Sequence, residues 1–138
     1  MKYTTPVPNV VFDRHLPTLT ESELKILLII IRQTYGWADK RTGGRKTRDR
    51  ITHSQFVMKT GLSRRVISKA INNLVLKELI SITDYQGTHL HTTLNRKGKS
   101  FLLYAPRFEP PKPKVSIYQG KQVGAVLGQR YWRFVGDM

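Results

Sequence analysis

The segment from Ile51 to Ile80 constrains the fold of this 138-residue chain more than any other, because its pattern fits two helices joined by a tight turn. Thr52 and Gln55 have the spacing of a capping box, which predicts the start of a short first helix. Gly61 suits the turn, since glycine readily adopts the positive φ that ends many helices. Ser63 can then cap a second, longer helix. The segment therefore predicts a helix-turn-helix unit.

The second of these helices has two opposed faces. Ile67, Ile71 and Leu74 repeat at i, i+4 and i+7, the spacing of a helix face that packs on a core. Polar and basic side chains occupy the start of the helix and the face turned away from that core, and are candidates for contact with DNA: Ser63, Arg64, Arg65, Ser68, Lys69 and Asn72. Such a helix can enter the major groove, where arginine suits guanine and asparagine suits adenine.

The charge of the whole chain favours the same kind of partner. Lysine and arginine total 24 against 9 acidic residues, which gives a formal net charge of +15. An excess of this size favours a polyanion. Together with the helix-turn-helix pattern, it predicts that the partner is double-stranded DNA.

Composition also limits where the protein is expected to act. The chain has no cysteine, which excludes disulfides and thiolate metal sites and fits a reducing cytosol. Its longest apolar run, Ile26–Ile31, is far shorter than the roughly 20 residues that cross a bilayer. The N-terminus lacks the apolar core of a signal peptide. We therefore expect a soluble, cytoplasmic protein that does not bind membranes.

An N-terminal segment and a helix begin the chain. Residues 1–18 contain three prolines and are expected to be extended. Thr20 and Glu23 have the spacing of another capping box, which predicts a helix up to about residue 34. One apolar stripe runs along this helix: Leu24, Leu27, Leu28 and Ile31. Ile26, Ile29 and Ile30 widen it, so this helix is expected to form the buried centre of the domain.

Residues 37–50 are expected to form a mobile basic loop. Gly43 and Gly44 should break any regular element, and basic residues outnumber acidic ones. The loop is either an ordinary solvated segment or an arm that contacts phosphates. In the second case the contacting side chains are Arg45, Lys46, Arg48 and Arg50.

A β-hairpin is expected directly after the helix-turn-helix. Its strands would be residues 80–85 and 88–94, joined by a turn at Gln86 and Gly87. A hairpin in this position is a wing. Four of its side chains are expected to contact phosphates or the minor groove: His89, His91, Arg96 and Lys97. The predicted fold class is mainly α with a small β-hairpin, a winged helix-turn-helix.

The chain is expected to divide into three parts. Residues 1–105 would form the winged-helix domain, residues 106–114 a proline-rich spacer and residues 115–138 a C-terminal tail. The tail carries three aromatic residues beside two arginines, and these types are enriched in protein interfaces. The tail therefore either binds a protein partner or folds back on its own domain through Tyr131, Trp132 and Phe134.

No catalytic constellation is evident. His89 and His91 would share one face of a strand and could pair as metal ligands, but the sequence offers no third ligand. The aspartates are scattered, without paired carboxylates on a predicted helix or strand. The Gly43-Gly44 pair and the basic residues after it lack the spacing of a phosphate-binding loop. We therefore expect no enzymatic activity, no cofactor and no metal.

Four motifs carry a family resemblance: PVPN at 6–9, LTESELK at 19–25, TYGW at 34–37 and TGLSRRVISKAI at 60–71. Their combination resembles the N-terminal winged-helix domain of phage replication protein O and related initiators of mobile elements, over roughly residues 5–95. The resemblance implies sequence-specific binding of double-stranded origin DNA, often through repeated sites and as a homodimer. The chain departs from the family in its apolar Val75-Leu76 pair and in its short tail, where a helicase-recruiting part is usual.

The leading hypothesis is a DNA-binding protein of replication initiation. A transcriptional regulator with the same DNA contacts is the first alternative. The second is a protein-binding adaptor that uses the aromatic tail, with an incidental basic surface.

Overall fold

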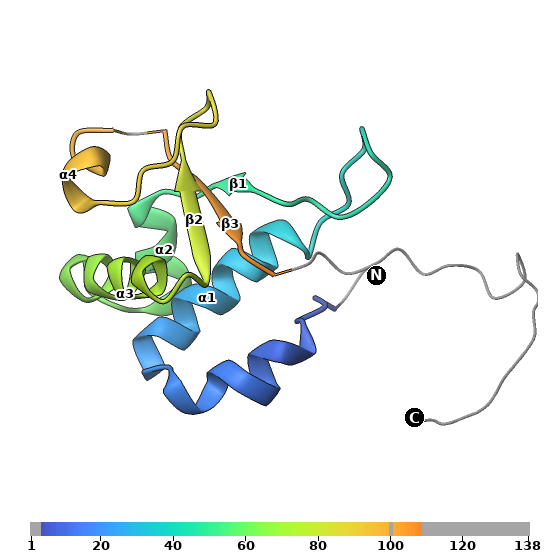
Figure 1. Cartoon of the computed structure of the whole chain (residues 1–138), viewed down its shortest axis with the longest axis horizontal. Helices are drawn as coiled ribbons and strands as arrows, with labels where there is room; N and C mark the ends of the chain where they lie inside the picture. Colours follow the sequence, from blue (N-terminus) through green and yellow to red (C-terminus); the bar gives the residue numbers. More distant parts are fainter. Residues whose placement is uncertain (1–3, 100, 109–138) are drawn as a thin grey trace, which may run out of the picture.

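The computed structural model describes residues 4–99 and 101–108. Helices α1, α2 and α3 pack beneath a small antiparallel sheet (Figure 1). In chain order the elements are η1 (Val11–His15), η2 (Leu16–Thr18), α1 (Glu21–Thr34), β1 (Asp49–Arg50), α2 (His53–Thr60), α3 (Arg64–Leu76), β2 (Ile80–Thr83), α4 (Thr93–Arg96) and β3 (Leu103–Pro106). The structure is thus mostly helical with a three-stranded sheet, which confirms the predicted fold class and is compatible with a winged helix.

Local side-chain signals set the ends of the helix-turn-helix as predicted. The Gln55 N–H donates to Thr52 Oγ1 (3.1 Å), and the Thr52 N–H donates to Gln55 Oε1 (2.8 Å). Gly61 ends α2 with a φ of 75°. Ser63 Oγ then accepts from the Val66 N–H (3.3 Å) at the start of α3. Each contact satisfies a backbone group that the helix itself leaves unpaired.

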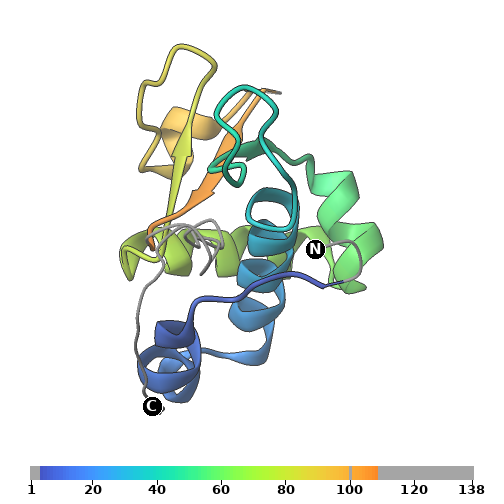
Figure 2. The same cartoon turned by 90° about the vertical axis from the view of Figure 1, so that its right-hand side faces the viewer.

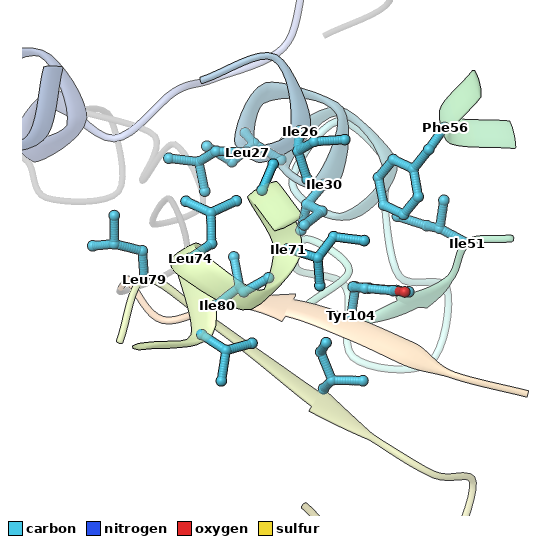
Figure 3. Close-up of a cluster of buried hydrophobic side chains, with 14 of the residues drawn as sticks. Ile26, Leu27, Ile30, Ile51, Phe56, Ile71, Leu74, Leu79, Ile80 and Tyr104 are labelled. Atoms are coloured by element: carbon cyan, nitrogen blue, oxygen red, sulfur yellow. The ribbon is translucent and has the colours of Figure 1, made fainter. Parts of the chain in front are cut away.

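The hydrophobic core lies between the sheet and the helices α1 and α3 (Figure 3). Four side chains of α1 are completely buried in it: Ile26, Leu27, Ile30 and Ile31. The predicted stripe was therefore partly wrong, because Leu24 is only half-buried and Leu28 is 37% exposed. Packing against α3, α2 and the sheet together rotates the buried face of α1 toward Ile26 and Ile30.

The sheet differs from the predicted hairpin. Its strand order is β1-β3-β2, with Arg50 opposite Leu103 and Ile82 opposite Tyr104. The expected second strand at 88–94 is not formed: this segment makes a single bridge, between Thr83 and His89, and then enters α4. Thr92 starts that helix by accepting from the Asn95 N–H (3.1 Å), so the segment cannot continue as a strand. β3 pairs with β2 instead.

The chain after β3 contacts the helical layer up to the last described residue, and the expected division at residue 105 stays a prediction. The Arg107 N–H donates to the Leu79 carbonyl (2.9 Å), and Tyr35 Oη donates to the Phe108 carbonyl (2.6 Å). These bonds attach the chain after β3 to the helical layer. The rest of the expected spacer and the whole tail lie outside the described residues.

Two segments that the sequence predicts to be irregular, residues 1–18 and 37–50, contain ordered turns. Residues 11–18 form the turns η1 and η2 rather than an extended chain, because Val11 is buried and Pro17 lies at the start of η2, where no N–H donor is needed. The expected loop at 37–50 is a small hairpin. Ala38 bridges Arg45, and the Lys46 N–H donates to the Trp37 carbonyl (2.9 Å). The glycine pair supplies the turn of this hairpin rather than preventing it.

Candidate nucleic-acid interface

Helix α3 turns its basic residues toward solvent and its apolar residues toward the core. Ile67 and Ile71 are buried. Five of the residues that the sequence selected for DNA contact are exposed: Ser63, Arg64, Arg65, Ser68 and Lys69. The hydroxyl of Ser63 also caps the helix. The described structure therefore leaves this face of α3 open to a partner.

A buried carboxylate holds the C-terminal end of α3 against α1. Glu23 is 2% exposed and accepts hydrogen bonds from Lys77 Nζ (2.6 Å), Asn73 Nδ2 (3.0 Å) and the Thr20 N–H (3.2 Å). Burial acts to raise the pKa of Glu23, but these bonds and the charge of Lys77 together leave the pKa below its ordinary value. Asn73 is thereby used to position the helix.

Asn72 and Arg96 contact each other, which the sequence did not predict. Asn72 is half-buried, and Arg96 Nη2 donates to its Oδ1 at 3.5 Å. Arg96 Nη1 donates to the Leu90 carbonyl (2.9 Å). Arg96 was expected at the end of a wing strand, but it lies in α4 and is half-buried against α3. Of the six residues selected around α3, only Asn72 is partly covered.

Two adjoining grooves lie beside α3. One, of about 310 Å³, is bounded by Arg50, the first turn of α2 and Arg64. The other, of about 220 Å³, lies between α3, α4 and the segment before β3. Both are lined by His53 and Lys99, and Arg64 Nη2 donates to Ser54 Oγ (3.1 Å) across the first one. Cationic and hydroxyl groups of this kind are the usual partners of DNA phosphates.

Sequence reasoning did not select three of these groove residues. The capping box at Thr52 locates the start of α2 and could have pointed to His53 and Ser54. No local signal places Lys99 there, because the path of the chain after α4 brings it to the groove. Burial lowers the pKa of His53, and the charges of Arg64 and Arg96 lower it further.

Acidic residues are missing from the sequence of this region. There is none between Arg50 and Lys77, and none between Tyr85 and Phe108. These stretches contain α2, α3 and α4. The cations at the grooves therefore reinforce one another, and their summed potential attracts an anionic partner.

The four loop cations selected from the sequence fall into two groups. Arg50 lines the first groove. Arg45, Lys46 and Arg48 lie in the hairpin before β1, which projects to the right in Figure 1, whereas α3 and α4 lie to the left. Lys46 Nζ also pairs with Asp49 Oδ1 (2.9 Å). Of these four cations, the structure brings only Arg50 to a groove beside α3.

The wing residues are separated in a similar way. Lys97 is exposed after α4 and lines the second groove. His89 and His91 are exposed, with their rings parallel and their centroids 5.2 Å apart. Across residues 4–99 and 101–108, no three histidine or carboxylate side chains come together as metal ligands. Contact of the two histidines with DNA stays a prediction.

The helix-turn-helix, the exposed basic face of α3 and the adjoining sheet are compatible with the winged-helix class of proteins. The family model for bacteriophage replication protein O matches residues 3–96. The chain therefore belongs to the bacteriophage replication protein O family, and the resemblance seen in its motifs is confirmed. Comparisons with curated proteins and with solved structures give no significant match. Among the described helices, none has the length and apolar character needed to cross a membrane.

Proposed function

We propose that the protein binds a specific double-stranded DNA sequence and acts in replication initiation of a phage or other mobile element, without catalysing a reaction and without a cofactor. The observation that carries the proposal is the orientation of α3: its apolar residues are buried while Arg65, Ser68 and Lys69 are exposed. Membership of the replication protein O family supports the role in phage replication.

In this proposal α3 lies in the major groove. Arg64, Arg65 and Lys69 contact base edges, and Asn72 reaches an adenine after its weak contact with Arg96 opens. The grooves beside α3 receive the phosphate backbone, with Arg50 and the neighbouring lysines as counter-charges. His89, His91, Arg45, Lys46 and Arg48 are more distant candidates for phosphate or minor-groove contact.

The test begins with selection of bound fragments from the source genome. On the selected site, Arg65→Ala should weaken binding by about 1–3 kcal/mol and relax the sequence preference at one position. Arg14→Ala is the matched control, because Arg14 is an exposed arginine in η1, outside both grooves. If the Arg65→Ala protein binds its preferred site as tightly as the unmodified protein, the recognition role of α3 is wrong.

The phosphate contacts have a different signature. Lys97→Ala should weaken binding to all sequences alike and lower the slope of log affinity against log salt by about 1. The same measurement on Arg48→Ala tests whether the hairpin before β1 also reaches the duplex. An unchanged slope for Lys97→Ala would contradict the placement of DNA along the second groove.

The proposal includes a homodimer on repeated sites, which sedimentation of the protein with and without site DNA can detect. Selected fragments that map to promoters rather than to an origin would favour a transcriptional regulator instead. The predicted protein partner of Tyr131, Trp132 and Phe134 stays a prediction, since these residues lie outside the described part of the chain.

A further inference from the structure

Two aromatic rings and an arginine gather at one end of the sheet. Tyr85 follows β2 and is 68% exposed, and Phe101 precedes β3 and is 43% exposed. Their rings meet edge to face, with centroids 6.2 Å apart. The guanidinium of Arg50, in β1, lies 5.0 Å from the centroid of the Phe101 ring. We call these three residues the aromatic cluster.

The strand register explains why the aromatic cluster faces outward. Arg50 and Thr83 both pair with Leu103, from opposite sides of β3. Side chains alternate along a strand, so residues two positions away share a face. Tyr85 and Phe101 each lie two residues beyond the pair of Thr83 and Leu103, just outside the strands, and their exposed rings meet there. The neighbouring positions in β2 and β3 point the other way, into the core between the sheet and helices α1 and α3 (Figure 3).

Burial does not account for these rings, since both remain substantially exposed. The nearest carboxylates in the sequence are already engaged: Asp84 Oδ1 accepts from the backbone N–H groups of Gln86 and Thr88 (both 2.9 Å), and Asp49 pairs with Lys46. Exposed aromatic rings beside cations have the composition of surfaces that bind single-stranded nucleic acid.

We propose that the aromatic cluster binds unpaired bases of single-stranded DNA, at a second site that shares Arg50 with the first groove beside α3. Every base has a flat face that can stack on Tyr85 or Phe101, and Arg50 supplies positive charge to the adjacent phosphates. A duplex keeps its base faces stacked on one another, so this site is specific for an opened strand. A protein partner fits less well, because the net charge of +15 on the chain complements a polyanion.

The test uses an oligothymidine of about 20 nucleotides with a fluorescent label, and anisotropy as the measure of binding. Tyr85→Leu and Phe101→Leu should each weaken oligothymidine binding roughly tenfold while duplex binding is retained. Phe12→Leu is the matched control, since Phe12 is an exposed aromatic residue of η1. Unchanged thermal unfolding shows that each variant is folded; leucine keeps an apolar group at both positions.

Variants at the two sites should have opposite effects on duplex and oligothymidine binding, so this inference can be tested separately from the proposed duplex function. Arg65→Ala should weaken duplex binding and leave oligothymidine binding unchanged. Loss of the duplex function alone would leave the aromatic cluster supported. Unchanged oligothymidine affinity in Tyr85→Leu and Phe101→Leu overturns the inference, as does an equal loss in Phe12→Leu. A change in self-association with constant oligothymidine affinity would identify a protein interface and would also overturn it.

Discussion

Replacement of Glu23 by glutamine tests how helix α3 is held in place. Glutamine keeps an oxygen that can accept from the Thr20 N–H, but it loses the charge opposite Lys77 and presents an NH₂ group where Asn73 donates. A hydrogen bond to a charged group contributes about 1.5–3 kcal/mol, and a neutral one about 1 kcal/mol. The Lys77 side chain is 36% exposed and can return to water, which reduces the cost. We therefore expect a loss of about 2–3 kcal/mol in the free energy of unfolding.

The assay is urea denaturation followed by circular dichroism, with Glu21→Gln as control. Glu21 lies in the same first turn of α1 but is exposed, so its replacement should change stability by no more than about 0.5 kcal/mol. The effect at Glu23 should depend on pH. Its folded-state pKa is lowered, so its contribution is complete above the ordinary carboxyl pKa of 4.5 and is lost as the pH falls through the lowered value.

The difference between the unmodified and Glu23→Gln proteins should accordingly be largest near neutral pH and shrink under acid. A difference that stays constant as the pH falls from about 7 to 3 would show that the carboxylate charge does not stabilise this contact. Equal destabilisation by Glu21→Gln and Glu23→Gln would show that helix charge, rather than the buried bonds to α3, sets the effect.

Two further predictions concern the turn and the buried tyrosines. Gly61→Ala should lower the free energy of unfolding in urea by about 1–2 kcal/mol, because Gly61 has a left-handed backbone that alanine disfavours. A Cβ at this position meets no atom within 4 Å, so a steric clash does not contribute. An unchanged free energy of unfolding would refute this backbone argument. Burial raises the pKa of Tyr35 and Tyr104 to about 12 each, so ultraviolet titration should show two phenols that ionise near pH 12. The free energy of unfolding should fall as the pH rises above the ordinary value of 10.0, because the unfolded chain then loses these protons first. Ionisation of all the phenols near pH 10 would show that these two are open to water.

The helix-turn-helix could be predicted from sequence because its determinants are local. The capping boxes at Thr20 and Thr52 and the left-handed Gly61 act within a few residues of the helix ends that they set. The faces of α3 follow from helical spacing alone, so the exposed positions of Arg65 and Lys69 were also predictable.

The wing could not be predicted in the same way, because strand pairing depends on distant residues. β2 could pair with the segment just after it or with one further along the chain, and alternating apolar residues do not distinguish the two. Thr92 caps α4 and removes the nearer segment as a strand, after which β3 takes its place. The position of Arg96 against Asn72 and the approach of Lys99 to the grooves both follow from that choice.

The middle strand of the sheet, β3, comes from residues beyond position 96, where the family match ends. During synthesis, helices α2 and α3 would therefore leave the ribosome before β3, the strand that joins β1 and β2. Until β3 arrives, β1 and β2 keep unpaired backbone groups, and the part of the core that Tyr104 fills stays open to water. A fragment that ends at residue 96, with the family match, would therefore lack the strand that joins β1 to β2.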